Sequence, residues 1–138
     1  MNPATEFGSR IDRGLIPAVP VPFCADGQID ASAQERYVAY MAAQPIAGVA
    51  VWAHTGRGLM LDGETAERVL RDWREALPEK VIVAGVGSRD PNFERATART
   101  LEMAECAGRI GADALLVYPP TWLQRKCRIL HFSVCRSS

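Results

Sequence analysis

The chain has 138 residues, 48% of them hydrophobic and 23% charged, and its formal net charge is zero. This composition is typical of a globular domain with a core of its own. A net charge of zero gives no general attraction to nucleic acids or to anionic membranes, so neither is expected as a partner. No apolar run approaches the roughly 18 residues of a membrane helix, and residues 1–13 lack the pattern of a signal peptide, so a cytoplasmic location is expected.

The four cysteines contain no Cys-x-x-Cys pair, and without a secretory signal they are expected to be reduced thiols. They are Cys24, Cys106, Cys127 and Cys135. Cys127, His131 and Cys135 recur every four residues, as zinc ligands on one helix face would. The residues between them alternate as in a strand, so neither a metal site nor a cofactor is expected.

Strand and helix patterns alternate along the first half of the chain. The apolar run at 14–21 contains two prolines, which suit the ends or the edge of a strand. Asp30 or Ser32 can cap a helix over 33–43, which has apolar residues at helical spacing. A second strand is expected at 46–52, and the glycines at 54–58 then indicate a loop.

The same alternation continues in the second half. A helix is expected from Asp62 or Gly63 to Leu77, where Pro78 ends it, and a third strand follows at 80–84. Pro91 suits the first turn of a long helix that reaches about Arg109. Its predicted inner stripe consists of Phe93, Ala96, Thr100, Leu101, Ala104 and Ile110. A fourth strand is expected at 112–118.

Apolar strands separated by helices predict an α/β fold with a parallel sheet that is buried on both faces. No Gly-x-Gly-x-x-Gly motif follows the first strand, which disfavours a dinucleotide-binding fold. Four strand–helix units of about 30 residues match the repeat of a (β/α)8 TIM barrel, which needs about 250 residues. We therefore expect the N-terminal half of such a barrel at 13–124, truncated after strand four. Residues 1–12 would be an N-terminal extension, and 125–138 an atypical basic tail, which a frame shift would explain.

Four sequence blocks in register resemble one enzyme family. They are VPF with DGQID within 21–30, GV leading to HTG within 48–56, AGVGS at 84–88, and GADA followed by PP within 111–120. In this order and spacing they are similar to the dihydrodipicolinate synthase and N-acetylneuraminate lyase family. The resemblance covers about residues 13–124.

The resemblance implies a class I aldolase mechanism, in which a lysine amine condenses with the ketone of pyruvate or another 2-oxo acid to form a Schiff base. The family's lysine lies on strand six and its proton-relay tyrosine on strand five, and neither strand is expected here. Lys80 precedes strand three, at the rim opposite to the one where barrel sites lie. Lys126 lies in the basic tail. No catalytic residue is therefore expected in this chain, which would be inactive alone.

The resemblance also implies substrate-binding residues in the loop at 54–58. Thr55 matches the family's carboxylate anchor, and the amides of Gly56 and Arg57 are further candidate donors. His54 replaces a threonine of the family's proton relay; as an imidazole it could act as a general base or simply end the strand. Two alternatives stay open: a non-catalytic module that binds a 2-oxo acid, and a half barrel that self-associates or aggregates through its open sheet edges.

Overall fold

The computed structural model describes residues 3–120. Within them the helices are α1 (Pro3–Ile11), α2 (Ala31–Ala42), α3 (Gly63–Ala76) and α4 (Phe93–Ile110), with a short 3-10 helix, η1 (Gly58–Met60). The strands are β1 (Gly48–Val51), β2 (Val81–Val86) and β3 (Ala114–Val117). None of the described helices is long and apolar enough to cross a membrane.

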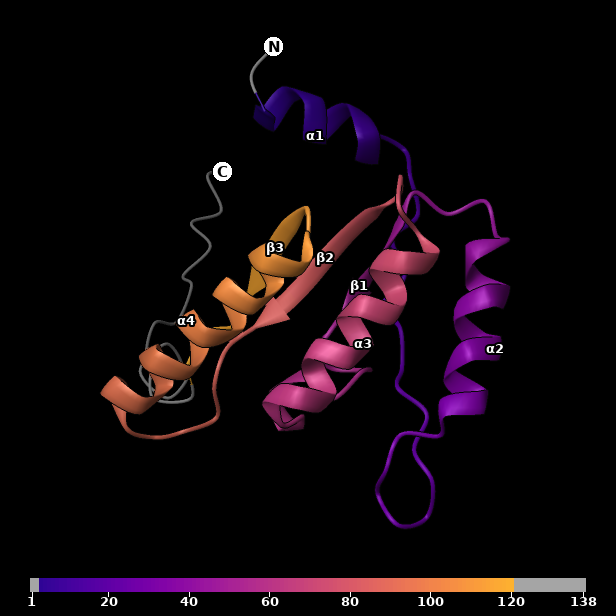
Figure 1. The fold of residues 1–138 in the computed structure, drawn as a ribbon. Helices are drawn as coiled ribbons and strands as arrows, with labels where there is room; N and C mark the ends of the chain where they lie inside the picture. The colour runs from indigo at the N-terminus through magenta and orange to yellow at the C-terminus, as the bar shows by residue number, and fades with distance from the viewer. Residues whose placement is uncertain (1–2, 121–138) are drawn as a thin grey trace, which may run out of the picture.

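The three strands form one parallel sheet in the order β1-β2-β3. Val49 lies beside Ile82 in the first pair, and Ala84 lies beside Leu115 in the second. Helix α3 connects β1 to β2, and α4 connects β2 to β3. Both helices lie over the same face of the sheet, and α2 lies next to α3 (Figure 1). This is the α/β arrangement with parallel strands that the alternating patterns predict. The expected burial on both faces is wrong for β3, because both helices cover one face and Leu115, Leu116 and Val117 are exposed.

The first predicted strand is wrong as a strand, although the segment lies where that strand was expected. Residues 15–19 run beside β1, where the amide of Val19 donates to the carbonyl of Ala50 at 3.1 Å and the amide of Ala50 donates to Pro17 at 2.9 Å. Only one parallel bridge, Ala18 to Ala50, is formed. Proline has no N–H to donate, so the prolines of this segment interrupt the ladder. Three strands and one extended segment therefore stand in place of four strands.

The core lies between the sheet and the helix layer. Alternate residues of β1 and β2 face the helices, and Trp73 of α3 and Met103 of α4 are buried against them. The Trp73 ring meets Tyr37 of α2 edge to face, with ring centroids 5.7 Å apart. Leu70 of α3 is buried as well, and so is Val38 of α2, which confirms that the helix over 33–43 has an apolar face.

The helix starts follow from their capping residues. Asp30, Asp62 and Asn92 accept hydrogen bonds from the amide three residues later, so each is an N-cap. The cap at Asn92 shows that Pro91 precedes α4 instead of occupying its first turn, which corrects that prediction.

The stripe predicted for α4 is also wrong in part. Phe93 and Leu101 are 61% and 56% exposed, whereas Met103 and Ala107 are buried with Ala96. Helix α4 packs against both α3 and β2, so its buried face is set by two neighbours and is rotated from the stripe that spacing alone suggests.

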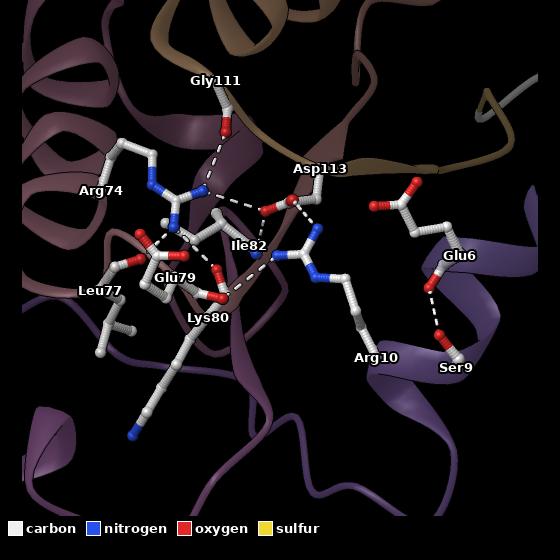
Figure 2. A network of polar contacts seen from close by, with 10 residues as sticks. All are labelled: Glu6, Ser9, Arg10, Arg74, Leu77, Glu79, Lys80, Ile82, Gly111 and Asp113. Atoms are coloured by element: carbon white, nitrogen blue, oxygen red, sulfur yellow. Dashed lines mark hydrogen bonds and ion pairs between the residues drawn. The ribbon is translucent and has the colours of Figure 1, made fainter. Parts of the chain in front are cut away.

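At the end of the sheet where the strands begin, the carboxylate of Asp113 forms ion pairs with two arginines (Figure 2). Its carboxylate accepts from Arg10 of α1 at 2.7 Å, from Arg74 of α3 at 3.0 Å and from the amide of Ile82 at 2.9 Å. Arg74 also donates to the carbonyls of Leu77, Lys80 and Gly111. Burial alone would raise the pKa of Asp113, but these donors outweigh it and hold the pKa below its ordinary value.

Candidate functional site

A cavity of about 320 Å³ lies at the opposite end of the sheet, where the strands end. Its lining comes from the segments that follow all three strands. These residues are Ala53, His54, Arg57, Gly58, Leu59 and Met60 after β1, Ser88 and Arg89 after β2, and Tyr118 and Pro119 after β3. In parallel α/β folds the carboxyl ends of strands are where ligands bind. The position makes this cavity the candidate site.

The loop after β1 has a fixed shape. Trp52 adopts a positive φ of 57°, and its indole is buried and donates to the carbonyl of Ala66 at 3.0 Å. A Cβ at Gly58 would overlap the carbonyl of Trp52, and one at Gly85 would lie 2.7 Å from it. The two glycines therefore let the loop fold over the end of β2, and a buried indole holds its first residue.

Within this loop the three predicted substrate-binding residues have different positions. His54 is exposed and lines the cavity, whereas Thr55 is exposed but does not belong to the cavity lining. Gly56 is buried, and a Cβ there would lie 2.8 Å from the carbonyl of Val19. The amides of Gly56 and Arg57 donate to the carbonyls of Ala53 and His54, at 3.0 and 3.1 Å. Those two amides are thus engaged within the loop, which leaves the Thr55 hydroxyl as the predicted donor that has no partner among residues 3–120.

His54 packs against Tyr118, which follows β3. Their ring centroids are 5.3 Å apart and the rings are tilted by 47°. A Cβ at Gly85 would lie 2.9 Å from Cε2 of Tyr118, so this glycine of β2 leaves room for the ring. The pair therefore joins the ends of β1 and β3 and forms one wall of the cavity.

Positive charge dominates the cavity wall. Arg57 and Arg89 belong to its lining, and no carboxylate of residues 3–120 does. Asp90, the next residue along the chain, has its carboxylate 2.8 Å from the guanidinium of Arg95 on α4. That hydrogen bond, together with the Asn92 amide, lowers the pKa of Asp90. Asp62 caps α3, and its hydrogen bonds from Thr65 lower its pKa too. Both nearby acids are therefore ionised and held by groups outside the cavity.

Lys80 is predicted to lie at the end of the strands opposite to the site, and the structure confirms this position. Lys80 comes just before β2, at the end opposite to the cavity, and its ammonium donates to the carbonyls of Ala42 and Gln44 at 3.0 and 2.9 Å. Lys126 and the spaced set Cys127, His131 and Cys135 lie outside the described residues. Among residues 3–120, no group of three or more His, Cys, Asp or Glu side chains has the arrangement of a metal site.

Sequence reasoning missed four lining side chains, those of Arg57, Ser88, Arg89 and Tyr118. A signal for them exists, because each comes shortly after the carboxyl end of a predicted strand, where polar residues line barrel sites. The sequence marks Arg57 only through its backbone amide and Tyr118 only as the last residue of a strand. Their side chains meet because the sheet brings the three loops together.

Two curated proteins are similar to this chain in sequence. A 4-hydroxy-tetrahydrodipicolinate synthase from Kineococcus radiotolerans is 33% identical over 120 residues, which cover 86% of this chain and 35% of that protein. A probable 5-dehydro-4-deoxyglucarate dehydratase from Pseudarthrobacter chlorophenolicus is 32% identical and covers 96% of this chain and 43% of its own length. The chain thus spans between about a third and about two fifths of the curated relatives it matches.

Solved structures share the fold. A putative dihydrodipicolinate synthase family protein from Coccidioides immitis superposes with a TM-score of 0.69 at 28% identity, over 79% of this chain and 34% of that one. N-acetylneuraminate lyase from Mycoplasma synoviae gives a TM-score of 0.66 at 27% identity, over 78% of this chain and 36% of that one. The family model of the dihydrodipicolinate synthetase family matches residues 12–130. The chain therefore belongs to the dihydrodipicolinate synthetase family.

Proposed function

We propose that this chain carries the 2-oxo-acid-binding part of a Schiff-base lyase or aldolase site, and that it binds pyruvate or a related 2-oxo acid without turning it over. The observation that supports this most is the position of the His54–Thr55 loop, at the end of β1 and beside a cavity at the carboxyl ends of three parallel strands. Thr55 keeps a hydroxyl, free of partners among residues 3–120, that can donate to the substrate carboxylate.

We expect no turnover because of where the two lysines of the chain lie. Schiff-base formation joins a lysine amine to the substrate ketone with loss of water, so the amine must reach the cavity. The sequence has two lysines, Lys80 and Lys126. Lys80 is engaged with two carbonyls at the opposite end of the sheet, and Lys126 belongs to the basic segment 125–138.

Binding is tested with the whole 138-residue chain and pyruvate, observed by saturation-transfer NMR. Thr55→Val should weaken binding about tenfold, the value of one hydrogen bond to a charged group. Thr97→Val is the matched control, because Thr97 is exposed on α4 and does not belong to the cavity lining, and it should leave binding unchanged. Equal loss in both variants, or no binding by the parent chain, would refute the proposal.

Covalent chemistry is tested separately by adding borohydride to the chain and pyruvate and measuring the intact mass. We expect no reduced adduct. An adduct mapped to Lys126 would show that the chain supplies its own nucleophile, and one on Lys80 would contradict the position of that residue as well.

A second candidate function is self-association, and the exposed apolar residues of β3 support it. On β3, Leu115, Leu116 and Val117 are 44%, 46% and 63% exposed, and among residues 3–120 only β2 pairs with this strand. Exposed apolar strand edges promote pairing between chains. The chain should sediment as a dimer or larger species, and Leu116→Lys should shift it toward monomer while Leu101→Lys, on exposed α4, does not. A monomer in all three samples would exclude this candidate.

A further inference from the structure

A groove of about 540 Å³ lies between α2 and α3, which are neighbours in the helix layer (Figure 1). Its apolar lining consists of Val38 and three alanines, and its charged lining comes from both helices. None of its lining residues belongs to the cavity at the carboxyl ends of the strands. What this α2–α3 groove binds is therefore independent of the proposed function.

Carboxylates dominate the charge of the α2–α3 groove. Glu35 of α2 and Asp72 and Glu75 of α3 belong to its lining, and so does one guanidinium, that of Arg68. Three negative charges and one positive charge give the lining a formal net charge of −2. No ion pair of these four residues occurs among residues 3–120. The groove therefore attracts a ligand that carries positive charge.

Asp72 is partly buried, and its charge is not compensated by its neighbours. Burial raises the pKa of Asp72, the Arg68 charge and a contact with Gln34 lower it, and repulsion from Glu75 raises it again. The pKa of Asp72 stays above its ordinary value, so the positive charge and the amide do not cancel the effect of burial. A cation close to both Asp72 and Glu75 would stabilise the two carboxylates together.

Gln34 of α2 lies against Asp72 on the buried side of the groove. Gln34 is 2% exposed, yet neither its Nε2 nor its Oε1 atom has a hydrogen bond of ordinary geometry within residues 3–120. Buried polar atoms almost always have a partner, and Oε1 can only accept, so it needs a donor. An ammonium group at Asp72 supplies such a donor, because it carries three N–H bonds.

We propose that the α2–α3 groove binds an aliphatic diamine, with one ammonium group between Asp72 and Glu75 and the other at Glu35. The two positive charges of the ligand equal the net negative charge of the lining, and Val38 and the alanines contact the methylene groups between them. A single divalent metal ion needs oxygen ligands that converge on one point. Among residues 3–120 no three acidic side chains have that arrangement, so two separated positive charges fit the groove better.

The test compares two probes that differ only at one end. 1,4-Diaminobutane has two ammonium groups, and 1-aminopentane has a methyl group in place of the second. Calorimetry with the whole 138-residue chain at low salt should show that the diamine binds about threefold more tightly, the value of one exposed ion pair. The affinity should fall as salt is added. Equal affinity for the two probes, or no binding of either, would overturn the inference.

Asp72→Asn keeps the shape of the side chain and removes its charge, so it should weaken binding of the diamine about tenfold. Asp12→Asn is the matched control, because Asp12 is exposed and does not belong to the groove lining, and it should leave binding unchanged. Arg68→Gln removes the positive charge of the groove and should tighten binding about threefold. Equal weakening in Asp72→Asn and Asp12→Asn would show a response to overall charge alone and would overturn the site.

Gln34→Leu tests the buried amide. It removes a polar group that has no partner, so the midpoint of urea denaturation should stay the same or rise, whereas diamine binding should weaken about threefold. Unchanged binding, or a lower midpoint, would overturn the assignment of Gln34 to the ligand. Pyruvate binding should be the same in Asp72→Asn as in the parent chain, so a failure of this inference is distinguishable from a failure of the proposed function.

Discussion

The two ends of the sheet use arginine in opposite ways. Where the strands begin, Arg10 and Arg74 share the carboxylate of Asp113, and Arg74 donates to three further carbonyls (Figure 2). Where the strands end, Arg57 lines a cavity that contains no carboxylate. In barrel folds the first end serves stability and the second carries function. The difference between paired and unpaired charge follows that division.

Backbone strain is more frequent in the loop after β1 than elsewhere. Among residues 3–120, Trp52 and Arg57 of this loop have positive φ values of 57° and 51°, and the third non-glycine residue with a positive φ is Arg13, at 55°. Such conformations cost free energy and persist where the surroundings impose them, often at sites of function. The end where the strands begin is held by side chains from α1, α3 and the start of β3 that satisfy one another. We therefore expect substitutions there to change stability, and substitutions in the loop after β1 to change binding.

The largest effect is expected for Asp113→Ala. The Asp113 and Arg74 side chains are only 16% and 19% exposed, so removing the carboxylate leaves a guanidinium that is partly buried and unpaired. The free energy of unfolding should fall by about 3 kcal/mol, measured by urea denaturation.

Arg10→Gln provides the graded comparison at the same carboxylate. The Arg10 side chain is 38% exposed, and exposed ion pairs contribute about 0.5 kcal/mol. Similar losses for Asp113→Ala and Arg10→Gln would show that burial does not distinguish the two ion pairs, and the start of the strands would lose its special role in stability.

A smaller effect on the free energy of unfolding is expected for Asp113→Asn, and it should depend on pH. The pKa of Asp113 is lower in the folded chain than in the unfolded one, where it is about 3.9. Its contribution to stability is therefore complete above the unfolded value and is lost as the pH falls through the folded value. Asp113→Asn should be less stable than the parent chain at pH 7, and the difference should shrink below about pH 4.

Other acids contribute to the acid dependence, so the difference between the two chains is the quantity to measure. Hydrogen bonds also lower the pKa values of Asp62, Glu67 and Asp90, while burial raises that of Asp72. These contributions are common to the parent chain and Asp113→Asn and cancel. A stability difference that stays constant from pH 7 to pH 3 would contradict the assigned role of Asp113.

Local signals explain which parts of the fold were predictable. The cap of α2 at Asp30, one of two candidates, and the start of α3 at Gly63, one of two expected positions, are encoded within a few residues, and the structure confirms both. Helix α1 was not predicted: residues 1–12 were assigned only as an extension. A nine-residue helix has little stability of its own, and the ion pair between Arg10 and Asp113 spans most of the chain. Such a contact leaves no local pattern.

The candidate site also has a part that local sequence predicts and a part that depends on contacts distant in the sequence. The loop glycines and His54 could be located from sequence, because the loop directly follows a strand and its motif is local. The contact of His54 with Tyr118 joins residues that are more than sixty positions apart, and only strand pairing brings them together. The role of Gly56 shows the limit of motif reading, since its lack of a Cβ serves packing against Val19 and its amide is already bonded.

The smallest effect, and the sharpest test of the division, is expected for Arg57→Gly. Relief of left-handed strain, worth about 1–2 kcal/mol, exceeds the entropy cost of glycine, about 0.5–1 kcal/mol, so the free energy of unfolding should rise by about 0.5 kcal/mol. Arg68→Gly is the control: it lies on the exposed face of α3, and glycine inside a helix should lower stability by about 1 kcal/mol. If Arg57→Gly lowers stability as much as Arg68→Gly does, the guanidinium has a structural role, and strain in the loop after β1 is not maintained for binding.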